Sequence, residues 1–300
     1  MRILCPMSPD IYGSLDKIIE NGANEFYMGY LMSDMRFGSH LSRRGGSRPN
    51  FHSLHDALDA IRKIKQAGKD VFITFNQKFY LEEHHERILK DTEILLKNRI
   101  DGVIVSDISL MVKMKEKFPN INMIASTVRY STNRNSFRFF NSFGVTKFVL
   151  SGALSIEEIN DILENNPEYG FEVFIKNEKC PNIDGLCSFS HEAIQSSYRT
   201  PCQGLKCNAE IPTRFNEMAC GACSIYDLRR SEGVSLKISG RPKSGEDISK
   251  DVAFIRHSID VLKANPNMGQ DEFIRITREK FKEIYGYDCE ENCYYKGRHR

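Results

Sequence analysis

Cysteine is the residue type whose number and spacing best indicate chemistry in this chain of 300 residues. Six of the nine cysteines fall between Cys180 and Cys223. They are Cys180, Cys187, Cys202, Cys207, Cys220 and Cys223, and the other three are Cys5, Cys289 and Cys293. Thiolates are soft ligands that suit zinc ions and iron–sulfur clusters, and four of them complete either kind of site. We therefore expect a metal centre in this segment.

The compartment of the protein bears on how these cysteines are interpreted. Residues 1–10 contain Arg2 and then Cys, Pro, Ser and Asp, without the apolar stretch of a signal peptide. No apolar run approaches the ~20 residues of a membrane span. We expect a cytoplasmic protein with no membrane partner. Structural disulfides are rare in that reducing compartment, which favours metal binding.

Spacing separates the two kinds of metal site. A structural zinc site usually has two short cysteine pairs, whereas in this segment Cys220 and Cys223 alone have two residues between them. The intervals before them include six, fourteen and four residues. This looser pattern favours an iron–sulfur cluster gathered from several loops, with zinc as the alternative. A second alternative is that some of these cysteines are small buried hydrophobic residues, but neighbouring Pro and Gly indicate loops.

Short β-type runs alternate with helical patterns, as in repeated βα units. The expected strands are 2–5, 25–29, 70–75, 102–105, 122–125, 147–150, 172–175 and 234–238. The expected helices are 54–67, 82–97, 108–118, 133–143, 155–163, 249–262 and 271–284. Ser155 and Glu158 predict a capping box at the start of one helix. The sequence predicts an α/β fold, a (β/α)8 TIM-barrel-like domain, with a doubly wound open sheet as the alternative.

One long interruption follows the seventh expected strand. About sixty residues rich in Cys, Pro, Gly and Asn come before the eighth strand. A structureless loop of that length is improbable in a compact domain, so a metal centre would have to order it. We therefore predict a single domain over residues 1–285, with a cluster-binding insertion at 176–233. Residues 286–300 are expected to form a loose, polar C-terminal tail.

Polar residues follow the expected strands at their carboxyl ends. They are Asn76, Ser106, Asp107, Ser126, Thr127, Lys176, Asn177, Ser239 and Arg241. Each could be a turn former or a helix cap. In a parallel barrel, however, these positions meet at one end, where active sites lie. We expect Asn76 and Asp107 to orient a hydroxyl or amide of the substrate.

The chain has the composition of an ordinary globular protein. Hydrophobic residues make up 40% and charged residues 27%, and the net charge of +2 gives no global attraction to nucleic acid. Local basic residues remain candidates. Arg43, Arg44 and Arg241 are expected to bind an anionic group, because guanidinium offers a planar fork to carboxylate or phosphate. The alternative for Arg43 and Arg44 is a solvated surface loop, since two glycines follow them.

These residues resemble a known family. Residues 172–177, followed by Cys180, Cys187 and Ser190, resemble the signature of the collagenase-like peptidase family of unassigned catalytic type, peptidase family U. Other similar blocks are residues 4–6, 22–29, 42–44, 72–76, 101–107, 144–150 and 236–241. The resemblance therefore spans the chain to about residue 262. The chain departs from the family pattern at residues 177–179 and 185–186. These departures leave the cysteine ligands in place, but they mean that the family's substrate cannot simply be carried over to this chain.

The resemblance implies a barrel-like fold and a [4Fe–4S] cluster held by four cysteines. Cys180, Cys187 and Cys202 match the first three ligand positions. The fourth ligand is expected to be Cys220 or Cys223, with Cys207 as the alternative. No catalytic residue is implied.

The resemblance also implies several activities. Some family members are labelled peptidases, and others support oxygen-independent hydroxylation of RNA bases or of a ubiquinone precursor. The chain has no HExxH motif and no GxSxG elbow. We therefore expect a cluster-dependent modifying enzyme, with a peptidase and a non-catalytic electron-transfer or scaffold protein as alternatives. The expected partners are a small-molecule or RNA substrate and an electron donor, and both a homodimer and a heterodimer remain open.

Overall fold

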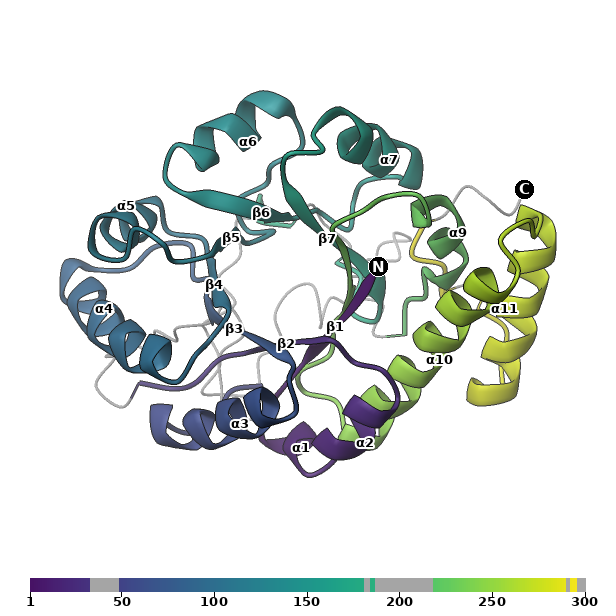
Figure 1. Ribbon diagram of the computed structural model, residues 1–300, viewed down its shortest axis with the longest axis horizontal. Coiled ribbons are helices and arrows are strands. Elements are labelled where there is room, and N and C mark those ends of the chain that lie inside the picture. Colours follow the sequence, from purple (N-terminus) through teal and green to yellow (C-terminus); the bar gives the residue numbers. More distant parts are fainter. Residues whose placement is uncertain (33–48, 181–183, 187–217, 290–291, 296–300) are drawn as a thin grey trace, which may run out of the picture.

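Eight parallel strands close into a barrel in the computed structural model, and helices surround it (Figure 1). The strands are β1 (Arg2–Pro6), β2 (Glu25–Met28), β3 (Asp70–Phe75), β4 (Gly102–Val105), β5 (Met123–Ala125), β6 (Val145–Val149), β7 (Gly170–Lys176) and β8 (Val234–Ile238). Each pairs with the next, and β8 pairs with β1. The structure describes residues 1–32, 49–180, 184–186, 218–289 and 292–295.

The closed ring confirms the predicted (β/α)8 barrel and shows that the doubly wound alternative is wrong. An open sheet would leave β1 and β8 without each other as partners, yet Ile3 pairs with Leu236 in the β1–β8 register. Short strands such as β2 and β4 are buried at every position. Burial on both faces is the pattern of a parallel barrel, whose strands contact packed side chains inside and helices outside.

Helices follow the strands in the expected order. They are α1 (Pro9–Tyr12), α2 (Leu15–Glu20), α3 (Leu54–Gln66), α4 (Glu82–Lys97), α5 (Ile108–Lys117), α6 (Arg134–Asn141), α7 (Ile156–Asn165), the 3-10 helix η2 (Ala222–Ser224), α9 (Ile225–Leu228), α10 (Gly245–Ala264) and α11 (Gln270–Tyr285). The sequence did not predict α1, α2, η2 or α9, because each is too short to show a helical period. None of the helices in the described ranges is long and apolar enough to cross a membrane.

The predicted capping box is confirmed at the start of α7. The Ser155 hydroxyl accepts a hydrogen bond from the backbone N–H of Glu158 at 3.2 Å, and the Glu158 carboxylate accepts one from the Ser155 N–H at 2.7 Å. These two bonds satisfy donors that the first turn of a helix leaves without partners. Local sequence alone therefore fixes where α7 begins.

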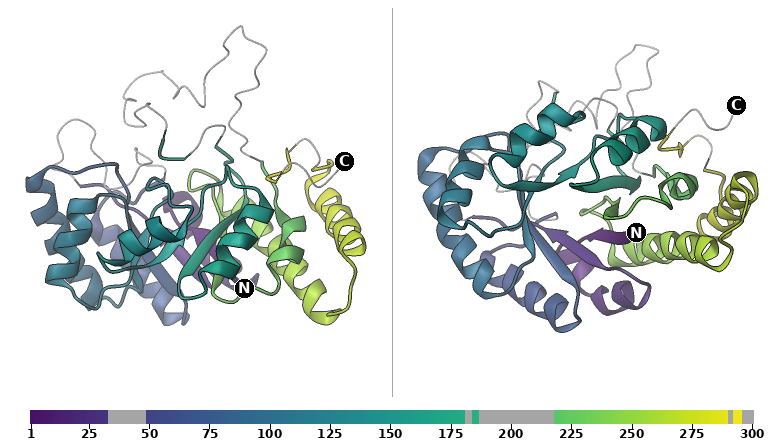
Figure 2. Two further views of the ribbon diagram at one scale, coloured as in Figure 1. Left: turned by 90° about the horizontal axis from the view of Figure 1, so that it is seen from above. Right: turned by 45° about the horizontal axis from the view of Figure 1, so that its top comes forward.

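The segment between β7 and β8 leaves the barrel and returns to it, because these two strands are hydrogen-bonded neighbours. Its position is that of the expected Cys-rich insertion. Residues 181–183 and 187–217 of the segment lie outside the described residues. The returning part passes through η2 and α9, and Figure 2 shows α10 and α11 side by side beyond it, with α11 outside the ring of helices.

Residues 292–295, which belong to the expected C-terminal tail of residues 286–300, contact the barrel. Cys220, on the returning segment, donates its backbone N–H to the carbonyl of Asn292 at 2.8 Å, and its own carbonyl accepts from Tyr294 at 2.8 Å. The hydroxyl of Tyr295 donates to the carbonyl of Phe174 on β7 at 2.5 Å. Both tyrosines are buried. Burial of two aromatic rings stabilises the segment in spite of its polar composition.

Two glycines make room for these tyrosines. A Cβ on Gly221 would lie 2.9 Å from the ring of Tyr295, and a Cβ on Gly152 would lie 2.9 Å from the hydroxyl of Tyr294. Real side chains do not approach so closely, so glycine is required at both positions for the tail to pack against the barrel. Tyr294 and Tyr295 are therefore packed against the barrel.

Candidate functional site

A buried network of charges fills the interior of the barrel below its carboxyl end. The ammonium group of Lys237 on β8 lies 2.5 Å from the carboxylate of Glu172 on β7. Lys147 on β6 lies 3.8 Å from the same carboxylate and 3.7 Å from that of Glu25 on β2. All four side chains point inward because inward and outward positions alternate along each strand. Buried charges persist only when they are paired in this way.

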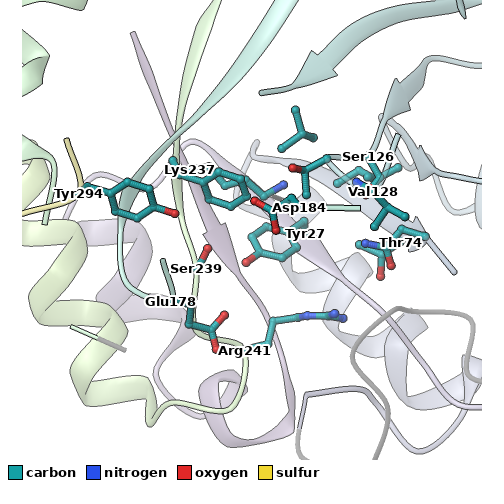
Figure 3. Close-up of a pocket in the computed structure, with 15 residues that line it drawn as sticks. Tyr27, Thr74, Ser126, Val128, Glu178, Asp184, Lys237, Ser239, Arg241 and Tyr294 are labelled. Carbon is teal, nitrogen blue, oxygen red and sulfur yellow. Dashed lines mark hydrogen bonds between the residues drawn. The ribbon is translucent and has the colours of Figure 1, made fainter. Parts of the chain in front are cut away.

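A cavity of about 100 Å³ opens above this network, at the carboxyl ends of the strands (Figure 3). Its polar lining consists of Thr74, Asn76, Ser126, Thr127, Glu178, Asp184, Lys237, Ser239 and Arg241. Its aromatic lining consists of Tyr27, Phe174 and Tyr294. Figure 3 shows acidic, basic and aromatic side chains around one space. The cavity thus offers hydrogen-bonding groups and flat rings together.

Two cations of the lining are held at fixed positions. Lys237 lies 4.4 Å from the centre of the Tyr27 ring, and burial lowers the pKa of Lys237 while the Glu172 carboxylate opposes that shift. The guanidinium of Arg241 donates to the amide oxygen of Asn50 at 3.1 Å. A Cβ on Gly29 would lie 3.0 Å from this guanidinium. Because Gly29 has no side chain, the guanidinium of Arg241 fits into the wall of the cavity.

The structure brings together most of the polar residues predicted at the strand ends. Asn76 and Arg241 line the cavity, as do Ser126, Thr127 and Ser239. We expected Asp107 to orient a substrate, but Asp107 is not among the residues that line the cavity. Its carboxylate caps α5 by accepting from the N–H of Leu110 at 2.7 Å, and it accepts from the N–H of Tyr80 at 3.1 Å. Asp107 is thus a helix cap.

Lys176 and Asn177 face away from the cavity. The Lys176 ammonium group lies 3.5 Å from the carboxylate of Asp251 on α10, and the Asn177 amide donates to the same carboxylate at 2.7 Å. Asn177 and Glu178 have φ values of 65° and 48°, in the left-handed region. Neither residue of this turn is a glycine, so the sequence does not indicate the left-handed conformation. The turn directs Glu178 into the cavity, whereas Lys176 and Asn177 point toward Asp251.

Comparison with known proteins was made for the chain as a whole. The model of peptidase family U32 matches residues 12–299. The chain belongs to peptidase family U32. The solved structure of the U32 peptidase Mk0906 has a TM-score of 0.54 at 13% identity, over 80% of this chain and 93% of that one, which agrees with the barrel fold.

Relatives of this U32 chain include proteins with names that refer to tRNA. The tRNA hydroxylation protein P of Haemophilus influenzae is 30% identical over 149 residues, which cover 47% of this chain and 32% of that protein. The tRNA hydroxylation protein P1 of Bacillus subtilis is 25% identical over 278 residues, which cover 85% of this chain and 63% of that protein. The chain therefore spans less than two thirds of the length of these relatives.

The ligands implied by the U32 resemblance can be located only in part. Cys180 is partly exposed and follows the turn at the end of β7. Cys187 and Cys202 lie outside the described residues, as do Arg43 and Arg44. Among the described residues, no group of three or more His, Cys, Asp or Glu side chains already has the geometry to hold a metal ion. The described residues alone therefore do not form a complete ligand set around Cys180.

Several lining residues of the U32 chain were not predicted as site residues. Tyr27, Glu178, Asp184, Lys237 and Tyr294 all line the cavity. Lys237 is preceded and followed by apolar residues in β8, so the sequence showed a buried cation inside a strand. A lysine there requires a buried acidic partner, and that requirement could have identified it together with Glu172. No comparable signal pointed to Tyr294.

Proposed function

We propose that this U32 chain is a tRNA-modifying enzyme that supports hydroxylation of a base bound at the mouth of the barrel. The names of the tRNA hydroxylation proteins in two bacteria support the substrate class. The cavity supports the mode of binding. The conclusion depends on the combination, at one site, of flat aromatic rings with amide, hydroxyl and cationic groups.

This combination suits an unstacked base. Proteins that recognise RNA by sequence stack such bases on aromatic or guanidinium planes and hydrogen-bond their edges. Tyr27 and Tyr294 supply rings, and Asn76 supplies an amide for a base edge. Pockets that enclose whole drug-sized ligands measure about 300–1,000 Å³. A cavity of about 100 Å³ therefore suits one planar ring better than a peptide segment.

The charges of the site suit the rest of a nucleotide. Arg241 is buried, and its guanidinium is anchored by Asn50. A guanidinium in a fixed position offers a planar fork to a phosphate oxygen, and less entropy is lost on binding than with a mobile side chain. Lys237 adds a second positive charge, which Glu172 holds in place. In this proposal Arg241 binds the phosphate that flanks the base.

The proposal includes a [4Fe–4S] cluster beside the mouth and a reaction that does not require oxygen. Cys180, Cys187 and Cys202 would hold the cluster with one further cysteine, and a bound cluster would supply one-electron transfer. Conversion of C–H to C–OH removes two electrons from the base, so a co-substrate other than O2 would have to donate the oxygen atom and take up these electrons. Cys180 lies four residues after Lys176, the last residue of β7. A group bound to Cys180 would therefore lie near Glu178, two residues earlier, which lines the cavity.

A peptidase is the competing function. Amide hydrolysis needs an activated nucleophile or a metal-bound water. The described residues that line the cavity include serine and threonine hydroxyls but no histidine or cysteine. Lys237 could act as a base only after losing its proton; burial favours that loss by lowering its pKa, but its nitrogen is paired with the Glu172 carboxylate at 2.5 Å. The geometry therefore gives less support to hydrolysis than to base binding.

The decisive experiment is mass spectrometry of tRNA nucleosides from cells that lack the gene. We expect a nucleoside heavier by one oxygen atom to disappear on deletion, in cultures grown with or without oxygen. The wild-type gene should restore it and Arg241→Ala should not. Arg275→Ala is the matched control, because Arg275 is an exposed arginine paired with Glu279 on α11.

Three outcomes would contradict the proposal. An unchanged nucleoside profile after deletion would exclude a role in tRNA hydroxylation. Cleavage of casein or gelatin by the anaerobically purified protein, if it persists after the cluster is removed, would support the peptidase. A reducible cluster in a protein whose deletion changes neither readout would favour the electron-transfer or scaffold alternative.

A further inference from the structure

Four of the described cysteines meet where the returning segment contacts the C-terminal residues. Cys220 forms an isolated parallel bridge with Cys293 and an antiparallel bridge with Lys176, the last residue of β7. The hydrogen bonds of Cys220 to Asn292 and Tyr294, described above, fix this register. Residues far apart in the sequence are thus neighbours in the backbone.

The other two cysteines are brought in by local turns. Cys223 lies three residues after Cys220, in the 3-10 helix η2. The carbonyl of Cys289 accepts from the N–H of Asn292 at 2.9 Å, and this turn brings Cys289 back toward Cys293. The thiols of Cys220 and Cys289 are hydrogen-bonded to each other.

The surroundings of these thiols are closed to water. Cys220, Cys223, Cys289 and Cys293 all have exposed fractions of 9% or less. Cys289 and Cys293 lie close enough to Cys223 to act on it electrostatically, and so does the guanidinium of Arg278. A buried thiolate group would need such a cation to offset its negative charge.

We propose that Cys220, Cys223, Cys289 and Cys293 form a structural zinc site. The spacing supports this metal, because the four residues form two short pairs with two and three residues between their members. Zinc is held by four thiolates in structural sites of this kind, with Zn–S distances of about 2.3 Å. Two short pairs on two segments are its usual arrangement.

The four thiols of the proposed site are not arranged around an ion in the metal-free structure. No three of the described side chains have ligand geometry in the absence of a metal ion. Zinc binding releases the thiol protons and draws the sulfur atoms into a tetrahedron. The backbone contacts that join the two pairs are already made.

The proposed ion has a clear structural consequence. It would fasten residues 292–295 to the end of β7, and Tyr294 of that segment lines the cavity and stacks on Phe174 at 6.3 Å between ring centres. Zinc would thus hold one wall of the cavity. This assignment leaves Cys180, Cys187, Cys202 and Cys207 for the iron–sulfur cluster of the proposed function, with Cys207 as fourth ligand.

The test is metal analysis of the full-length protein, purified anaerobically from cells supplied with iron and zinc. We expect one zinc ion per chain in the wild type and none in the Cys289→Ser/Cys293→Ser variant, while iron and sulfide remain unchanged. Cys180→Ser should show the reverse, with iron lost and zinc kept. Cys5→Ser is the control, because Cys5 is a buried cysteine on β1 that belongs to neither set.

Two results would overturn the proposal. Loss of iron from the Cys289→Ser/Cys293→Ser variant would assign these thiols to the cluster, and full retention of zinc would assign the ion to other ligands. If the variant does not fold, the wild type provides the test. In urea, which opens buried segments, alkylation followed by peptide mass spectrometry should show these four cysteines protected only while zinc is bound, and equal labelling in urea with and without a zinc chelator would exclude the site.

Discussion

The ammonium group of Lys237 lies 2.5 Å from the carboxylate of Glu172 inside the barrel, where the exposed fractions of the two side chains are 7% and 0%. Lys147 shares the same carboxylate from the neighbouring strand β6. Glu172 therefore faces two cations at once, and it is the paired carboxylate of the buried Lys237, whereas Lys147 also lies 3.7 Å from Glu25.

Glu172→Gln should destabilise the protein strongly. Removing one partner of a buried ion pair leaves an uncompensated charge, which costs about 3–5 kcal/mol. Urea unfolding would measure the loss. Glu246→Gln is the control, because Glu246 pairs with Lys250 on the exposed surface of α10 and its replacement should not change the midpoint measurably. Equal losses in the two variants would contradict a central role for Glu172.

Gly152→Ala should displace Tyr294 from the cavity wall. The new Cβ would lie 2.9 Å from the Tyr294 hydroxyl and 3.0 Å from its ring, and such overpacking costs about 1–3 kcal/mol. Adding Tyr294→Phe should recover part of this loss, because it removes the nearer atom. Gly13→Ala is the control, since its Cβ would meet nothing within 4 Å. Thermal unfolding of the four proteins would reveal whether the contact exists.

Asp107→Ala should reduce stability without reducing activity per folded molecule. Loss of an N-cap side chain costs about 0.5–2 kcal/mol. Asp107→Asn should retain most of the stability, because its amide oxygen can still accept from the N–H of Leu110. Chemical denaturation and the tRNA nucleoside assay would separate the two effects. A loss of hydroxylated nucleoside in both soluble variants would instead restore the predicted role in substrate orientation.

Tyr285 should make stability depend on alkaline pH. Burial, with the Asp251 carboxylate 2.6 Å away, raises the pKa of Tyr285 above its ordinary value of 10.0. Above that pH the unfolded chain loses the phenolic proton while the folded chain keeps it, so the free energy of unfolding falls as pH rises. Tyr285→Phe lacks this group. At neutral pH it should be less stable by about 1.5–3 kcal/mol, the usual contribution of a hydrogen bond to a charged group.

The measurement is a series of urea denaturation curves from pH 8 to pH 11, the upper part of which brackets the ordinary tyrosine pKa of about 10. The difference in stability between the wild type and Tyr285→Phe should narrow above about pH 10. A constant difference would show that Tyr285 titrates normally in the folded protein.

Hydrophobic periodicity was sufficient to predict the barrel. All eight strands occur, and β3, β4 and β8 have the predicted bounds, because strands buried on both faces form short apolar runs between turn residues. The short elements α1, α2 and α9 could not be predicted in this way. They form because tertiary contacts, and not a repeated pattern, cover their apolar side chains.

The site was predicted less completely than the fold. Asn76 and Arg241 could be placed because a parallel barrel brings the carboxyl ends of its strands together. Asp107 occupies an equivalent position, and nothing local distinguishes a cap from a substrate ligand. Tyr294 reaches the cavity through backbone pairing with Cys220, a contact between distant parts of the chain that no local pattern encodes.

The pairing of the C-terminal residues with the end of β7 also bears on the order of folding. Tyr27 and Tyr294 line the same cavity, although nearly the whole chain separates them. Contacts between such distant residues form slowly, because the entropy of closing the intervening loop is lost before they stabilise anything. During synthesis, the cavity cannot be complete until Tyr294 has left the ribosome and docked. A ligand that contacts the ring of Tyr294 can therefore bind only after residues 292–295 have packed against β7.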